Sequence, residues 1–154
     1  MKSSFTNPVA MARNAIGAVT LMSLINVMLV YFNLPPIMPL GLTMPISFAV
    51  MAFSTPDSII DLYPDPAQLA FFRQVSLVWV VLILAILAYA FWRMAKKPKA
   101  VMIGLVVVVL DTIALTSLYP ILSLGFVVEL LYHGLVLYYL FKGYKAIKQE
   151  IAHV

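Results

Sequence analysis

Cysteine is absent from the 154 residues of this chain. Its absence excludes disulfide bonds, thiolate nucleophiles, cysteine-held zinc and iron–sulfur clusters. The sequence also has no G-x-S-x-G, no phosphate-binding glycine loop, no H-E-x-x-H and no G-x-x-x-G motif. We therefore expect no cofactor and name no catalytic residue, and an enzyme is the least favoured class of function.

Charged side chains are scarce as well. They make up 10% of the sequence, whereas hydrophobic residues make up 64%, and the mean hydropathy is +1.03. A soluble domain carries about 25% charged residues. The composition is therefore not that of a chain folded inside one water-facing shell, and we predict a single integral-membrane domain over residues 1–154.

Five apolar stretches give the expected spans. They cover residues 14–32, 37–53, 71–92, 100–118 and 121–141. Most approach the ~20 residues that cross a hydrocarbon core of roughly 30 Å as a helix. The second stretch is shorter and contains Pro39 and Pro45, which interrupt helices. We predict an all-α helical bundle with four transmembrane helices and one Pro-broken re-entrant or interfacial segment, residues 35–53, packed against the bundle. The alternative is five transmembrane helices.

Basic residues set the expected orientation. They follow the third stretch as Arg93, Lys96, Lys97 and Lys99, and the last stretch as Lys142, Lys145 and Lys148. Because Lys and Arg close to span ends stay on the cytoplasmic side, we expect both segments and the C-terminus inside. The segment with Asp57, Asp61 and Asp65 is then outside. With four spans the N-terminus, which carries Lys2 and Arg13, is also cytoplasmic, and the protein belongs to the plasma membrane.

Two carboxylates lie at one depth inside the last two expected spans. Asp111 is about 12 residues, or roughly 18 Å, beyond Lys99. Glu129 is about 13 residues, or roughly 20 Å, before Lys142. His133 follows Glu129 by one helical turn on the same face. A charged group at the centre of a span costs about 2.5–3.5 kcal/mol, so these side chains are expected to face the bundle interior.

Polar residues of the first span complete the predicted site. Asn26 falls at the same depth, about 13 residues from Arg13, and continues a stripe with Thr20 and Ser23. We predict an ion, proton or polar-ligand site made of Asp111, Glu129, His133 and Asn26, with Thr112, Ser23 and Thr20 in support. The alternative is a structural network of hydrogen bonds between helices, each contributing about 0.6 kcal/mol. No metal is expected, because zinc usually takes three protein ligands.

Two segments carry a recognisable pattern. Residues 12–32 read ARNAIGAVTLMSLINVMLVYF, with Arg13-Asn14 near the start. Residues 110–146 read LDTIALTSLYPILSLGFVVELLYHGLVLYYLFKGYKA, with Leu110-Asp111-Thr112, Glu129 four residues before His133, and Tyr138-Tyr139-Leu140 before Lys142-Gly143. The pattern, which covers under half of the chain, resembles a family of small multi-span membrane proteins from Gram-positive bacteria. That family more often has Asp where Glu129 stands. The resemblance implies a multi-span membrane fold and supplies no activity.

Two classes of function remain open. The first is a small transporter or channel-like protein, coupled to protons or cations through Asp111, Glu129 and His133. It would act as a homo-oligomer, because four short spans enclose little volume. The second is a non-enzymatic accessory or assembly subunit of a larger membrane complex. In both cases the lipid bilayer is a partner and nucleic acid is not. We expect the two carboxylates and the histidine to share fewer than two full negative charges.

Overall fold

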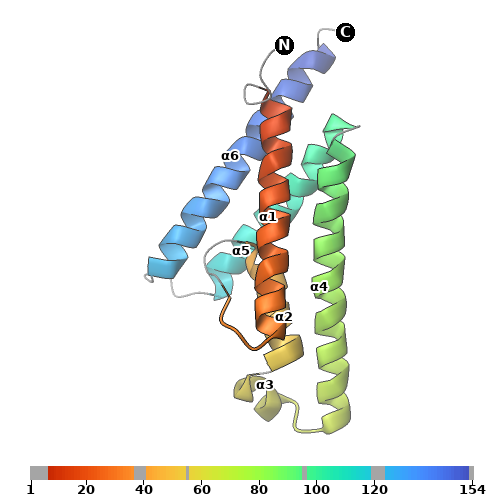
Figure 1. Cartoon of the computed structure of the whole chain (residues 1–154), viewed down its shortest axis with the longest axis vertical. Coiled ribbons are helices and arrows are strands. Elements are labelled where there is room, and N and C mark those ends of the chain that lie inside the picture. The colour runs from red at the N-terminus through yellow and green to blue at the C-terminus, as the bar shows by residue number, and fades with distance from the viewer. Residues whose placement is uncertain (1–6, 37–40, 55, 95–96, 119–123, 153–154) are drawn as a thin grey trace.

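The computed structural model describes residues 7–36, 41–54, 56–94, 97–118 and 124–152, and all regular structure among them is helical (Figure 1). The elements are α1 (Pro8–Tyr31), α2 (Thr43–Ala49), the π-helical turn η2 (Val50–Ser54), α3 (Asp57–Leu62), α4 (Pro66–Met94), the 3₁₀ turn η3 (Pro98–Ala100), α5 (Val101–Leu118) and α6 (Leu124–Ala152). The predicted all-α class is thus confirmed. Lys2, Pro39, Lys96 and the expected hairpin tip at Tyr119-Pro120 fall outside the described residues.

The sequence explains where α1 begins and ends. Asn7 caps the first turn, because its side-chain oxygen accepts a hydrogen bond of 2.9 Å from the amide of Val9. Pro8 occupies the first helical position, where a missing amide hydrogen costs nothing. The helix ends at Tyr31, and Asn33 adopts a left-handed φ of 58°, which Asn tolerates better than most residues. The chain can therefore turn back at this end.

After this turn the chain returns to the middle of α1 and then runs alongside it. The amide of Leu42 donates to Ser23 Oγ at 2.8 Å, about two turns before the end of α1. The ring of Phe53, in η2, lies 5.2 Å from the ring of Tyr31 at the end of α1. The helical segment Thr43–Ser54 therefore begins inside the bundle and finishes at the end where α1 finishes (Figure 1).

The expectation that Pro45 breaks this segment is wrong. Pro45 is the third residue of α2, in the first turn, where an amide would have no partner within the helix. The helix departs from α geometry only later, at the π-helical turn Val50–Ser54. The segment contacts α1, α4 and α5, so it packs against the bundle as expected.

Two long helices extend beyond the apolar stretches that predicted them. α4 begins at Pro66 rather than at residue 71, and α6 continues to Ala152 rather than ending at residue 141. Asp65 supports the early start of α4 by accepting a hydrogen bond of 2.9 Å from the amide of Ala67. Hydropathy locates only the apolar part of a helix, whereas capping and helix propensity decide where it ends.

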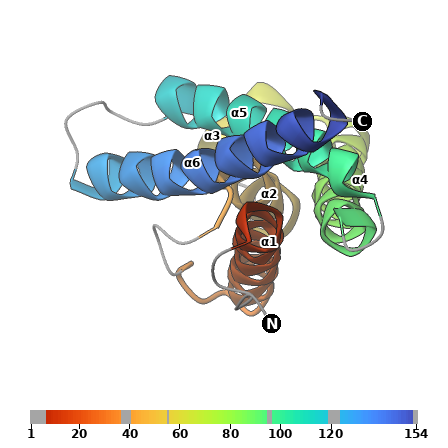
Figure 2. The ribbon, with the colours of Figure 1, turned by 90° about the horizontal axis from the view of Figure 1, so that it is seen from above.

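The long helices pack in two directions. α1 and α4 run side by side, and α5 and α6 lie obliquely across them (Figures 1 and 2). Where α6 crosses α1, a Cβ atom built on Gly143 would lie 2.7 Å from the Cβ of Ala12, so glycine permits this close approach. Buried side chains of all four helices, among them Ile16, Leu87 and Leu140, form the main core.

The outer faces of the bundle are apolar. Within the described residues, three helices are long and apolar enough to cross a membrane: Pro8–Tyr31, Pro66–Met94 and Leu124–Gln149. Two further apolar helices, Thr43–Ser54 and Val101–Ser117, are shorter. Many large hydrophobic side chains are exposed on these helices; Phe71 and Leu131, for example, are each 68% exposed, which is compatible with a membrane protein.

The two glycines Gly143 and Gly134 give a matched test of the α1–α6 contact. Both lie in α6, but a Cβ atom on Gly134 would meet nothing within 4 Å. Alanine adds the same helix propensity at both positions. We expect Gly143→Ala to be less stable than Gly134→Ala by about 1–3 kcal/mol, because overpacking forces the helices apart. Thermal unfolding of the two variants in detergent measures the difference, and equal stability would contradict this packing.

Candidate functional site

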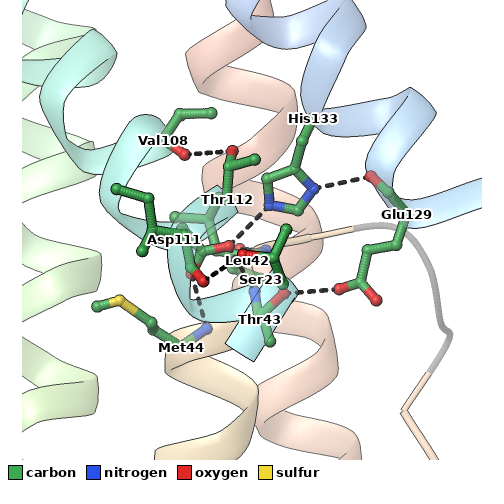
Figure 3. A network of polar contacts seen from close by, with 11 residues as sticks. Ser23, Leu42, Thr43, Met44, Val108, Asp111, Thr112, Glu129 and His133 are labelled. Carbon is green, nitrogen blue, oxygen red and sulfur yellow. Dashed lines mark hydrogen bonds and ion pairs between the residues drawn. The ribbon is translucent and has the colours of Figure 1, made fainter. Parts of the chain in front are cut away.

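A cluster of polar side chains lies buried where α1, α2, α5 and α6 meet (Figure 3). Each member is at most 2% exposed. We call it the buried polar cluster, and it consists of Ser23, Asn26, Thr43, Asp111, Glu129 and His133. Five of these were expected from the sequence. Thr43 was not among the expected site residues, and it turns out to be central.

Asp111 caps the N-terminus of α2 from a different helix. Its Oδ1 accepts a hydrogen bond of 2.7 Å from the amide of Met44, and its Oδ2 accepts one of 2.8 Å from the amide of Thr43. The first amides of any helix lack partners within it, and Leu42 at the N-cap position has no side chain that can supply one. A carboxylate here also complements the positive end of the helix dipole. Asp111 therefore holds the segment in place inside the bundle.

His133 connects Asp111 to α6 through one proton. Its Nδ1 lies 2.8 Å from the backbone carbonyl oxygen of Glu129, which can only accept, so Nδ1 carries a hydrogen. Its Nε2 lies 2.7 Å from Asp111 Oδ2. A hydrogen bond between these two atoms requires one proton, on the imidazole or on the carboxyl group. In either form the Asp111–His133 pair is neutral overall.

Glu129 joins the cluster through Thr43. The hydroxyl of Thr43 donates a hydrogen bond of 2.8 Å to Glu129 Oε1, while its amide donates to Asp111. The sequence placed the two carboxylates at one depth, and the structure brings both against the same threonine. Thr43 thus bridges them, and Glu129 is the second titratable acid of the cluster.

Ser23 and Asn26 hold the returning chain against α1. Ser23 Oγ accepts from the amide of Leu42. Gly41 has a φ of 135°, and a Cβ atom there would lie 3.0 Å from Asn26 Nδ2 and 3.3 Å from the backbone of Ser23. Only glycine fits this close approach and this backbone conformation. Ser23 therefore positions the turn before α2, with Asn26 packed beneath Gly41.

The hydroxyls of Thr20 and Thr112 donate to backbone carbonyls of their own helices rather than to members of this cluster. The hydroxyl of Thr112 donates to the carbonyl of Val108 at 2.7 Å (Figure 3). The hydroxyl of Thr20 donates to the carbonyl of Ile16, also at 2.7 Å. Each bond satisfies a hydroxyl within its own helix, a common pattern for threonine in helices. These bonds therefore do not connect Thr20 or Thr112 to the cluster, as the expected supporting role would require. Ser23, the third residue expected in support, does bond to the chain that enters the cluster.

The geometry of the cluster is that of hydrogen-bonded acids rather than of metal ligands. Among the described residues, no group of three or more His, Cys, Asp and Glu side chains could hold a metal ion. The side chains of Glu129 and His133, one turn apart, reach different partners, Thr43 and Asp111. What the cluster can do chemically is hold a proton between Asp111 and His133 beside a second acid.

Thr43→Val tests the bridge between the carboxylates. Valine keeps the shape of threonine and the amide that donates to Asp111, but it removes the donor to Glu129. We expect a loss of about 1–3 kcal/mol in unfolding free energy, the cost of leaving a buried acceptor without its donor. Thr112→Val is the matched control and should change stability by under about 0.5 kcal/mol. Chemical unfolding in detergent measures both, and equal effects would show that the bridge contributes nothing.

No protein-family model, no curated protein and no solved structure matches this chain. The likeness to small multi-span proteins of Gram-positive bacteria therefore stays an expectation.

Proposed function

We propose that this chain is an integral membrane protein of the plasma membrane that conducts protons, in the manner of a channel, through the buried polar cluster. Its spans are α1, α4, α5 and α6, and Thr43–Ser54 is a re-entrant segment. The observation that carries the proposal is the 2.7 Å contact between His133 Nε2 and Asp111 Oδ2, which requires one proton between them. Thr43 connects this pair to a second acid, Glu129.

The distribution of charge supports the membrane topology. The end of the bundle where α4 finishes and α5 starts carries Arg93, Lys97 and Lys99. The opposite end carries Asp57, Asp61 and Asp65, in and after α3. Basic residues are retained on the cytoplasmic side, so this distribution supports a topology with both termini inside. α5, with 18 residues, is about 27 Å long, close to the thickness of the hydrocarbon core.

The position of Thr43–Ser54 supports a re-entrant segment. Its first residue is bonded to Asp111 inside the bundle, and η2 contacts Tyr31 at the outer end of α1. Non-helical backbone within a membrane is tolerated where protein covers it. Leu42, which precedes the helix, is 1% exposed and bonded to Ser23. The turn at Gly41 and Leu42 thus has the protein cover that such a segment requires.

The composition of the cluster supports proton handling over simple packing. Packing between helices needs only hydroxyls and amides, whereas an ionisable residue in a span is expensive and by default indicates function. Here three ionisable side chains are fully buried together. If the proton between Asp111 and His133 is removed, the charge of one of these two side chains changes. Because Asp111 caps the first amides of α2, this change alters the cap. Protonation and the seating of the re-entrant segment are therefore coupled.

Proton movement in reconstituted vesicles tests the proposal. Glu129→Gln keeps an oxygen that accepts from Thr43 but cannot titrate. We expect wild-type protein to carry protons into liposomes that contain a pH-sensitive dye when a membrane potential is imposed. The rate for Glu129→Gln should be at least about tenfold lower, a conservative figure because a positioned acid or base typically contributes about 100-fold or more to the rate of proton transfer. Unfolding temperature should not change.

Asp61→Asn is the matched control, because Asp61 is an exposed carboxylate in α3. It should retain the wild-type rate. If wild-type vesicles behave like empty ones, or if Glu129→Gln and wild type conduct equally, the cluster is structural. The protein would then be better described as an accessory or assembly subunit of a larger membrane complex.

A further inference from the structure

A pocket of about 290 Å³ lies between the start of α5 and the last turns of α6, well apart from the buried polar cluster. Five residues line it: Lys99, Met102, Tyr144, Ile147 and Lys148. The two lysines come from different elements, η3 and α6. Two lysines beside one small pocket place positive charge around it, and this charge attracts an anion.

These two lysines differ from their neighbours on α6. Lys142 lies over the ring of Tyr138, with its Nζ 5.8 Å from the ring centroid, and Lys145 lies over Phe141 at 4.9 Å. Lys99 and Lys148 instead border the pocket. The basic end of the bundle thus contains one pair of lysines that borders a cavity and another pair that lies over aromatic rings. The positive-inside rule explains the presence of both pairs, but it does not explain why one pair borders a cavity.

The pocket has an apolar floor that continues along α5. Ile147 is buried and Met102 is 40% exposed. Beyond Met102, Val106, Val109 and Ile113 follow at helical spacing and are 52%, 40% and 57% exposed. Spacings of four, three and four residues place these side chains on one face of the helix. An exposed apolar track therefore leads from the lysines toward the middle of the bundle.

We propose that this pocket binds an anionic phospholipid. The phosphate group lies between Lys99 and Lys148, and an acyl chain follows the track from Met102 to Ile113. Basic pockets between helices on the cytoplasmic side are suited to such headgroups, and the apolar floor favours a lipid over a free anion. The inference depends on the proposed membrane insertion but not on proton movement through the buried polar cluster.

The test is lipid binding by the full-length protein in neutral detergent, followed by native mass spectrometry. The probes are dioleoyl phosphatidylglycerol, dioleoyl phosphatidylcholine and inorganic phosphate. Lys99→Gln with Lys148→Gln is compared with Lys142→Gln with Lys145→Gln, which removes the same charge from outside the pocket. We expect phosphatidylglycerol to bind in preference to phosphatidylcholine. The pocket variant should weaken that binding by about tenfold to thirtyfold, since each lysine near a lipid surface contributes roughly a fivefold factor.

The control pair should stay within about twofold of wild type, and millimolar phosphate should not compete. Equal losses in the two double variants would overturn the proposal in favour of diffuse charge attraction. Equal binding of the two lipids, or displacement by phosphate, would also overturn it. These outcomes are independent of the liposome assay, because loss of proton movement in Glu129→Gln needs no change at this pocket. Protein that does not insert into lipid vesicles at all would instead refute both proposals.

Discussion

The carboxylate of Asp111 satisfies the first two amides of α2 inside the bundle, and the rest of the polar interior depends on this contact. A helix that starts in an apolar protein interior leaves its first amides without partners, each at a cost of several kcal/mol. No side chain at Leu42 can cap α2 locally. The cap therefore has to come from another helix, which fixes α5 beside the start of the segment.

The positions of the other polar groups depend on this contact. The buried charge of Asp111 needs a partner, and His133, a residue of α6, lies 2.7 Å from it. Thr43, placed by the cap, directs its hydroxyl to Glu129. On the other side the amide of Leu42 meets Ser23 on α1. One carboxylate thus links four helical elements, so a change in its charge reaches α1, α2 and α6 together. In the proposed function, this set of contacts couples the protonation of Asp111 and His133 to the position of the segment.

The sequence predicts the parts of this arrangement that depend on hydropathy and helical spacing. The apolar stretches anticipate the four long helices, and the spacing of Glu129 and His133 anticipates their common face. The role of Thr43 could not be predicted, because Asp111 bonds to backbone amides, which every residue except proline has. The sequence feature that comes closest to indicating it is Gly41, followed two residues later by a single threonine within an apolar stretch. Pro45 was misread as a break, since proline in a first turn and proline in a helix interior look alike until the helix start is known.

In the proposed topology, Leu34 and Ser58, which precede and follow the re-entrant segment Thr43–Ser54 in the chain, lie on the same side of the membrane. The chain has no native cysteine, so single cysteines can be placed at Leu34, Ser58 and Lys97 and labelled in intact cells with a maleimide that does not cross membranes. Leu34→Cys and Ser58→Cys should both be labelled from outside, and Lys97→Cys only after the membrane is permeabilised. Labelling of positions 34 and 58 from opposite sides would contradict the claim, because the segment would then cross the membrane completely.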